Sequence, residues 1–470
     1  MGGRPTRSPP GGRTFGGQKR GFKSAFAAEI EAEVEALIGP GTAEGIDFEA
    51  IETAARRQAL GIACRAVEHC LNADKSDHVG PQLACGCGAA ARYAGRHAKT
   101  ITTALGEMTL SRAYYHCAKC QSGFFPRDRA MGIVDASLSP AVTRMTGLVG
   151  AMVSFEEGQE LLGELAGVRV NTKQVERAAE ALGAEIADDE RRHVHPVIDS
   201  EIPPTLYLGM DGTGVPIRRQ ELVGRAGKQA DGSAKTREAK LCTLWSAEGR
   251  AADGTPMRDE GSVTYSAAIE SAAQRDVDEQ PSAFAARVER EAKRRGFERA
   301  GRQAVLGDGA PWIWNMADEY FPDAVQIVDL FHVKQHLSDV GKAIYGPTSE
   351  LAMQWGRQRH DELDEGRLDA LLQALRTHTA THDEARKCVD YVERNRDRMR
   401  YPEFRAQGLC TSTGVVEAGC KVAIGTRLKR AGMHWTVRGA NAIIALRCAK
   451  LSGRFEDFWE RRSAAVAVAG

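Results

Sequence analysis

Two stretches of the sequence decide the predicted fold. Residues 206–214 read LYLGMDGTG and residues 303–310 read QAVLGDGA, so each is a short apolar run that ends in an aspartate followed by glycine. Short apolar runs bounded by glycine are typical of buried strands. Ligands of an open α/β sheet bind at the carboxyl ends of its strands. Asp211 and Asp308 are therefore candidate site residues at one edge of a predicted sheet.

The sequence around these strands predicts an alternating α/β domain. Further strands are expected at residues 240–245, 262–265 and 324–328, with helices at about 281–296 and from Pro311 onward. The resulting order is three strands, a helix, a fourth strand and later a helix that carries an acid. This is the order of an RNase H-like fold, which places acids on its first and fourth strands.

A third acid, Glu417, ends the run STGVVE, which predicts the first turn of a helix capped by Ser412 or Thr413. Two strand-end aspartates and a helical glutamate form the hard oxygen donor set that Mg²⁺ and Mn²⁺ prefer. Two such ions about 4 Å apart activate a water or a 3′-hydroxyl and stabilise the leaving oxygen. The sequence therefore predicts a two-metal site, with two Mg²⁺ or Mn²⁺ ions held by Asp211, Asp308 and Glu417, and phosphodiester chemistry there.

The gap between Asp308 and Glu417 is longer than a bare fold of this kind needs. Residues 333–408 are mostly polar with helical periodicity, so we expect them to form a helical insertion between the fifth strand and the catalytic helix.

Several segments resemble DDE transposases of the ISKra insertion-sequence family, which are relatives of Mutator-like enzymes with a helical insertion. They are 208–216 (LGMDGTGVP), 305–314 (VLGDGAPWIW), 327–337 (IVDLFHVKQHL), 413–417 (TGVVE) and 427–436 (RLKRAGMHWT). The similarity extends over about residues 80–455, including the cysteine-containing segment upstream.

The resemblance implies that Asp211, Asp308 and Glu417 are the catalytic triad of a transposase. It also draws attention to Asp329 and His332, an Asp-x-x-His pair after the fifth strand that is similar to a Cys/Asp-x-x-His motif of related transposases. This pair could support the site by orienting substrate or a metal ligand. A structural hydrogen bond at a strand–helix junction is the equally good alternative.

Four cysteines form two close pairs, Cys85-x-Cys87 and Cys117-x-x-Cys120, around a predicted β-hairpin with its turn near residues 106–107. The second pair has the spacing of a zinc knuckle, and the first is one residue shorter. Four thiolates around Zn²⁺ would stabilise a β-module that is too small to fold on its own core. We expect a zinc-ribbon-like module with structural Zn²⁺. The alternatives are four unbound thiols, or His116 in place of one cysteine.

A helix-turn-helix candidate follows this module. A helix at about 156–166 ends at Gly167, and a second helix begins after Asn171, which forms a capping-box pair with Gln174. Lys173, Gln174 and Arg177 lie near the start of the second helix and are candidate DNA contacts. An ordinary αα-hairpin is the alternative, because composition does not separate the two.

The formal net charge is zero, but the charge is unevenly distributed. Residues 1–23 hold six basic residues and no acid, and residues 418–455 are again basic without an acid. Segregated positive charge suits a phosphate backbone, although chance clustering on a solvated face is the alternative. The candidate DNA contacts in the second block are Lys421, Arg427, Lys429, Arg430 and Trp435. Trp435 could stack on an unpaired base or be a core residue.

The predicted fold class is multidomain α+β, with an RNase H-like core that is interrupted by a helical insertion. The predicted parts are a disordered basic tail (1–23), a helical N-terminal segment (24–80, with helices at about 24–38 and 48–72), the zinc-ribbon-like module (81–128), a helical region with the helix-turn-helix candidate (129–200), the first part of the core (201–332), the insertion (333–408), and the catalytic helix with the basic C-terminal part (409–470).

These features predict a DNA transposase that cuts at the terminal inverted repeats of an element and joins the freed 3′-hydroxyl to target DNA. A homodimer or higher oligomer on DNA is expected, because two ends must be brought together. No apolar run approaches the ~18 residues that span a bilayer, and no secretory signal is present, so a cytoplasmic, nucleoid-associated bacterial protein with no membrane partner is expected. The rivals are an RNase H-like nuclease without strand transfer, a catalytically silent DNA-binding descendant, and a zinc-ribbon regulator with an unrelated α/β domain.

Overall fold

A computed structural model describes residues 27–28, 30–32, 35, 47–194, 196, 198, 201–227, 229–272, 281–412 and 414–469. The chain forms two compact units. The first comprises residues 1–142 with 164–169 and 470, and the second comprises residues 143–163 with 170–469. The predicted tail at 1–23 lies outside the described residues, and most of the helix predicted at 24–38 does too.

The first unit contains a four-stranded antiparallel sheet in the order β1-β2-β3-β4. Its strands are β1 (Gln82–Ala84), β2 (Ala90–Thr103), β3 (Gly106–His116) and β4 (Gly123–Phe124). The long hairpin of β2 and β3 is the hairpin predicted between the two cysteine pairs. Its turn lies at residues 104–105, slightly before the predicted position, and Thr103 stabilises it by donating a 2.8 Å hydrogen bond to the Gly106 carbonyl.

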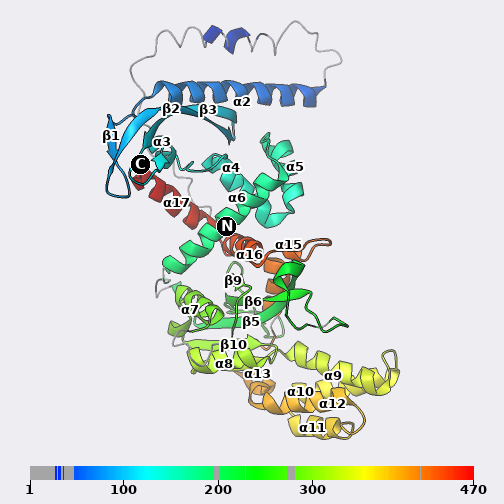
Figure 1. The fold of residues 1–470 in the computed structure, drawn as a ribbon. Helices are drawn as coiled ribbons and strands as arrows, with labels where there is room; N and C mark the ends of the chain where they lie inside the picture. The colour runs from blue at the N-terminus through cyan, green and yellow to red at the C-terminus, as the bar shows by residue number, and fades with distance from the viewer. Residues whose placement is uncertain are drawn as a thin grey trace. The chain divides into compact units, whose positions relative to one another are not determined.

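Helix α2 (Phe48–Ala73) packs along this hairpin, as Figure 1 shows for the long blue helix beside β2 and β3. Asn72 fixes the helix to β3, because its amide donates to the Thr109 carbonyl at 2.8 Å and its oxygen accepts from the Ser111 amide at 2.7 Å. A small apolar core lies around Cys64 and Leu110. The short helix α3 (Pro126–Ala130) begins with proline, as expected of a first helical turn.

The second unit is built on a five-stranded mixed sheet in the order β11-β10-β5-β6-β9. The strands are β5 (Thr205–Pro216), β6 (Thr236–Trp245), β9 (Thr264–Ala268), β10 (Arg302–Gly307) and β11 (Val325–Val328). β10 is parallel to β5 and β11, whereas β6 is antiparallel to β5 and β9. All five strands correspond to predicted strands. A short hairpin of β7 (Gly249–Arg250) and β8 (Pro256–Met257) was not predicted.

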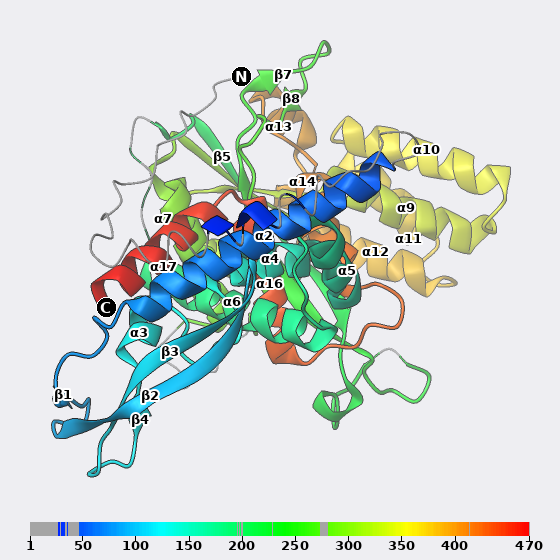
Figure 2. The same cartoon turned by 90° about the horizontal axis from the view of Figure 1, so that it is seen from above.

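Helices pack against both faces of this sheet, as Figure 1 shows for α16 on one side and α8 on the other; Figure 2 shows the same elements from above. Helices α7 (Ala283–Arg295) and α8 (Pro311–Tyr320) contribute Phe284 and Ile313 to a core with Leu208 and Met210 of β5. Helix α16 (Val437–Leu451) packs over β9 and against α6 (Thr172–Arg192). Consecutive residues of β5, β6 and β10 are buried, as expected for strands that are covered on both faces of the sheet.

Residues after β11 form a group of helices: α9 (Leu330–Tyr345), α10 (Glu350–Asp364), α11 (Leu368–Arg376), α12 (Asp383–Arg394) and α13 (Tyr401–Ala406). Their buried leucines and valines are continuous with the core of the sheet. The Tyr401 hydroxyl donates to the Val328 carbonyl of β11 at 3.0 Å. The predicted insertion is therefore helical and is fixed to the β10–β11 side of the sheet.

Further helices of the described residues are α4 (Pro140–Met152), α5 (Phe155–Ala166), α14 (Gly414–Gly419), α15 (Thr426–Leu428) and α17 (Phe455–Ala469). Among the described residues, no helix has both the length and the apolar character that a bilayer span requires. The described residues form a mixed α/β protein with a four-stranded antiparallel sheet, a five-stranded mixed sheet and the short β7–β8 hairpin.

Candidate active site and cysteine cluster

Asp211 lies within β5, and Asp308 is the residue that directly follows the neighbouring strand β10. The last registered pair of β5 and β10 joins Gly209 to Leu306, and two residues further along each strand lead to Asp211 and Asp308. Residues two apart on a strand point to the same face. The two carboxylates therefore lie side by side where the parallel neighbour of β5 ends, and they interact electrostatically.

Asp211 does not end its strand, and this corrects the sequence prediction. β5 continues to Pro216 and stays paired with β6. Gly212 and Gly214 suggested a turn from the sequence, but they lie within the strand. A Cβ at Gly212 would come within 2.5 Å of the Glu238 carboxylate, and one at Gly214 would meet Thr236. The glycines make space for side chains of β6.

The Asp211 carboxylate is largely removed from water. Burial raises its pKa above the ordinary value, and the neighbouring charge of Asp308 raises it further. Hydrogen bonds from the Cys420 thiol and from the Gly212 amide at 2.6 Å act in the opposite direction. A pair of adjacent acids in this setting has an unfavourable negative charge that a cation would offset.

Glu417 lies in the first turn of α14 (Gly414–Gly419), as predicted. The adjacent Val416 is buried directly over Gly209, where a Cβ would come within 2.1 Å of the Val416 methyl group. Gly419 lies close to Leu241. Thr413, one of the two predicted caps, lies outside the described residues.

The Glu417 side chain itself is exposed, and in the described part of the chain it does not share a metal-sized cluster with Asp211 and Asp308. Its helix is nevertheless fixed beside Asp211, because Cys420 follows one turn later and its thiol touches that carboxylate. α14 continues as a π-helix (Cys420–Gly425) and a short α15 (Thr426–Leu428). Such π-segments are frequent at functional sites.

Asp329 caps α9 by accepting a hydrogen bond from the His332 amide at 2.8 Å. Its own amide donates to the Gly307 carbonyl at 2.9 Å. The structural hydrogen bond that the sequence left open is thus present. The His332 ring contacts His336 one turn further on, with 3.2 Å between the two Nε2 atoms. Burial, followed by the charge of His332, lowers the pKa of His336.

Helix α12 of the insertion also reaches this site. The Tyr391 hydroxyl donates to the Asp308 carbonyl at 2.8 Å, and its ring lies 4.8 Å from that of His336. Gly309 has a φ of +94°, and a Cβ there would meet the Tyr391 ring at 2.4 Å. Only glycine fits both the backbone conformation and the space.

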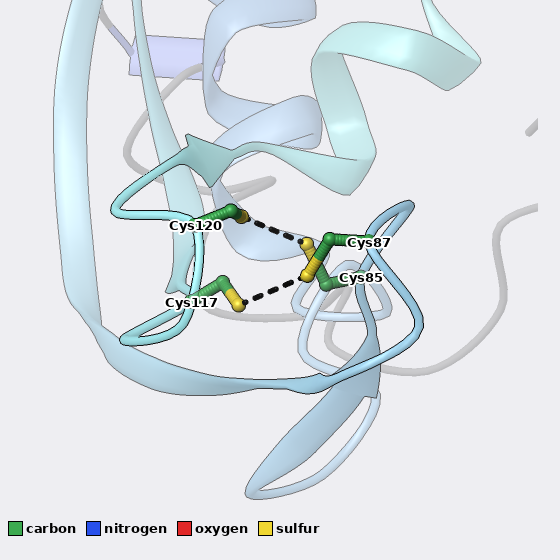
Figure 3. A group of neighbouring side chains, drawn as sticks. All are labelled: Cys85, Cys87, Cys117 and Cys120. Carbon is green, nitrogen blue, oxygen red and sulfur yellow. Dashed lines mark hydrogen bonds between the residues drawn. The ribbon is translucent and has the colours of Figure 1, made fainter.

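Four cysteines of the first unit point toward one centre (Figure 3). The sulfurs of Cys85 and Cys120 lie 3.5 Å apart and those of Cys87 and Cys117 lie 3.7 Å apart. All four sulfurs lie within 4.8 Å of one another, and His116 is not part of the group. This arrangement could hold a structural metal ion such as Zn²⁺.

Tight turns place these sulfurs. The Gly88 amide donates to the Cys85 carbonyl at 2.9 Å, and the Cys117 amide donates to the Ser122 carbonyl at 2.9 Å. The Ser122 hydroxyl lies 2.9 Å from the Cys120 sulfur, and hydrogen bonds from Ser122 lower the pKa of that thiol to about 6. The thiolate is the form that binds metal.

The predicted second helix of the helix-turn-helix is α6, and its capping box is present, with Asn171 and Gln174 bonding reciprocally at 2.9 Å. The Gln174 side chain is thereby used in the cap. Lys173 and Arg177 are exposed, and Lys173 pairs with Glu176 at 2.7 Å. The apolar face of this helix, formed by Val175, Ala179, Leu182 and Ile186, is buried.

The basic C-terminal block divides into exposed and buried residues. Lys421, Lys429 and Arg430 are exposed. Lys429 contacts the Thr213 hydroxyl of β5, two residues beyond Asp211 on the same face, and Arg430 pairs with Glu157.

Arg427 and Trp435 lie in the core, so neither presents a surface to DNA in this conformation. Arg427 is 0% exposed and donates to the Gly150 carbonyl at 2.9 Å. Its guanidinium lies 5.0 Å from the Trp435 ring and 4.6 Å from that of Phe155. The Trp435 indole donates to the Leu428 carbonyl at 3.1 Å. The core alternative for Trp435 is the one observed, because a tryptophan of this size fills the space between α15 and α5.

Three residues at the site were not predicted from the sequence: His336, Tyr391 and Cys420. The spacing of His332 and His336 puts them on one helical face and could have been noticed. The spacing of Glu417 and Cys420 gave a similar signal. Tyr391 had none, because tertiary packing alone brings it to Asp308.

Together, the fold and the site define a mixed α/β protein with a pair of adjacent sheet acids and a candidate cysteine metal site. The profile of the uncharacterised protein family UPF0236 matches residues 89–462. The chain belongs to this family.

Comparison with curated proteins found no match. Among solved structures, one that is similar is the Drosophila P element transposase strand transfer complex, at 9% sequence identity and a TM-score of 0.25. That similarity covers 72% of this chain and 84% of the other.

Proposed function

We propose that this protein is a DDE transposase of the ISKra type, which cleaves DNA at the ends of an element and joins the freed 3′-hydroxyl to target DNA. The observation that carries the proposal is the closeness of Asp211 on β5 to Asp308 just after the parallel strand β10, beside a helix that carries Glu417. The strand order β11-β10-β5-β6-β9 is the order expected if the second unit is an RNase H-like core, and it supports the proposal.

Asp211, Asp308 and Glu417 are the proposed ligands of two Mg²⁺ or Mn²⁺ ions. The residues fit such ions, because the donor atoms are all carboxylate oxygens and the charge of Asp308 raises the pKa of Asp211. When bound, the ions would activate the attacking oxygen and stabilise the leaving oxygen.

The chain's own groups would prepare the site for that chemistry. Cys420 and the Gly212 amide hold the Asp211 carboxylate in place, and Tyr391 holds the carbonyl of Asp308. Lys429 and Lys421 are exposed on the segment that follows Glu417, where they would contact phosphates of the DNA strand. Asp329 and His332 would support the Asp308 edge.

The cysteine cluster and α6 are the proposed DNA-recognition parts. A structural Zn²⁺ on Cys85, Cys87, Cys117 and Cys120 would fix the loops at the end of the β2–β3 hairpin. Lys173 and Arg177 would reach terminal-repeat DNA from the start of α6. If Lys173→Ala with Arg177→Ala leaves end-specific binding unchanged, this assignment of the helix is wrong. Two copies of the chain are proposed to act together, one at each end.

The test is cleavage and joining of the DNA that flanks this gene, with Mg²⁺ or Mn²⁺. Glu417→Gln and Asp308→Asn are expected to lower both activities at least roughly thousandfold while DNA binding stays. The matched controls are Glu384→Gln on α12 and Asp323→Asn before β11, which change exposed acids away from the site. The controls should behave as the unchanged protein.

Each of the other outcomes would favour a different function. Cleavage that survives Glu417→Gln removes this residue from the active site and overturns the triad. Cleavage without joining, when a 3′-hydroxyl end is supplied, identifies a nuclease. Sound end binding with no cleavage in the unchanged protein identifies a catalytically silent DNA-binding protein.

A further inference from the structure

His332 and His336 have the geometry of two ligands to one metal ion. They lie four residues apart on α9, so their side chains project from one face of the helix. Their Nε2 atoms are 3.2 Å apart, and the ring planes are nearly perpendicular at 87°. Two imidazole nitrogens at the usual metal distance of about 2.05 Å, held at a tetrahedral angle, are about 3.3 Å apart.

The surroundings of this pair favour a cation. The charges of Asp308 and Asp339 act on His336, and the charge of His332 acts on Asp211. The Tyr391 ring packs against the ring of His336, and the Tyr391 hydroxyl donates a hydrogen bond to the Asp308 carbonyl. Tyr391 therefore holds His336 close to the backbone of Asp308. In the part of the chain that the structure describes, no lysine or arginine side chain donates a hydrogen bond to the His332 or His336 ring. No such donor therefore competes with a metal ion for the ring nitrogens.

We propose that His332 and His336 bind a transition-metal ion at the Asp308 side of the sheet. Neutral imidazole suits Zn²⁺ and transition-metal ions such as Co²⁺ better than Mg²⁺, which prefers oxygen donors. The proposal rests on the histidine geometry and not on the proposed transposase activity, and it adds a nitrogen-containing site to the carboxylate set.

Binding can be measured with Co²⁺ on the full chain after the cysteine cluster has been loaded with Zn²⁺. We expect one Co²⁺ bound through imidazole, in addition to any ions that the carboxylates hold, without the near-ultraviolet absorption that thiolate ligands give to Co²⁺. Proton NMR should show two strongly shifted, exchangeable imidazole N–H signals.

His332→Ala and His336→Ala should each remove one or both signals and weaken Co²⁺ binding at least roughly tenfold, since even the partners of metal ligands contribute that much. The matched controls are His378→Ala and His382→Ala, a pair with the same sequence spacing whose rings lie 6.2 Å apart. Both controls should bind Co²⁺ as the unchanged protein does.

Two results would overturn the proposal. One is Co²⁺ binding without shifted imidazole signals, because the ion would then lie on carboxylates only. The other is equal affinity in the His332 and His336 variants, which would leave the 3.2 Å contact as a simple hydrogen bond. Neither result depends on DNA cleavage, so a failure here is distinct from a failure of the transposase proposal.

Discussion

Gly309 offers a direct test of how the helical insertion positions Asp308. The residue follows Asp308, has a φ of +94°, and lies against Tyr391 of α12. Gly309→Ala adds a single methyl group at this point. We expect two separate penalties, one from the backbone conformation and one from the collision with the Tyr391 ring.

Their sizes follow from the structure. A non-glycine residue in the left-handed region costs about 1–2 kcal/mol. The new Cβ would lie 2.4 Å from the Tyr391 ring and 2.9 Å from its hydroxyl oxygen, so the ring must move. Overpacking of this kind costs about 1–3 kcal/mol. Gly309→Ala should therefore lower the free energy of unfolding by about 2–5 kcal/mol.

A double-mutant cycle with Tyr391→Ala separates the two penalties. Urea unfolding followed by tryptophan fluorescence reports on this unit, because Trp245 and Trp314 are buried in its core. In the Tyr391→Ala background, the collision disappears and Gly309→Ala should cost only the backbone part, about 1–2 kcal/mol. An equal cost in both backgrounds would refute the argument that Tyr391 occupies the space beside Gly309.

Three further predictions concern metal binding, pH and the buried basic residues. Cys117→Ser should abolish stoichiometric Zn²⁺ binding, measured by metal analysis, and lower the melting temperature of the first unit; retained zinc would contradict the four-thiolate site. Burial raises the pKa of Asp211 in the folded state, so ionisation opposes folding and stability falls as pH rises through the interval between the ordinary and the raised pKa. Asp211→Asn should therefore raise the melting temperature at neutral pH in EDTA and remove this pH-dependent loss; a lower melting temperature would contradict the burial argument. Arg427→Ala should lower the free energy of unfolding by about 2–4 kcal/mol, because packing is lost and a backbone carbonyl loses its hydrogen bond. The same change should leave the salt dependence of DNA binding unchanged, whereas Lys421→Ala should reduce that dependence.

The strands of the second sheet could be predicted because their signal is local. Runs such as LYLGM and QAVLG are buried on both faces, and a buried strand must be apolar throughout. The capping box of α6 is also local, because Asn171 and Gln174 satisfy each other's backbone within one turn. The full length of β5 was not predicted, because its glycines suggested a turn in the sequence. In the structure they make space for side chains of β6.

The grouping of the four cysteines followed from their spacing and the hairpin between them, since a hairpin returns its two ends to the same place. The candidate active site could be predicted from the sequence only in part. Asp211 and Asp308 were visible as acids after apolar runs, and Glu417 as an acid in a helical turn. The contact of Tyr391 with Asp308 joins residues 83 positions apart, and no local pattern records it.

The sequence by itself determined the type and order of the main helices and strands, the positions of the two aspartates at the sheet, and the grouping of the four cysteines. These depend on periodicity, turn residues and short spacings, which act between near neighbours along the chain. Tertiary structure alone decided which basic residues of the C-terminal block are exposed to solvent. Arg427 and Arg447 are buried, while Lys421 and Lys429 are exposed. An arginine has a long apolar stem and a charged end, so the same residue type can lie on the surface or in the core. The choice depends on whether backbone carbonyls and aromatic rings from distant segments meet its guanidinium.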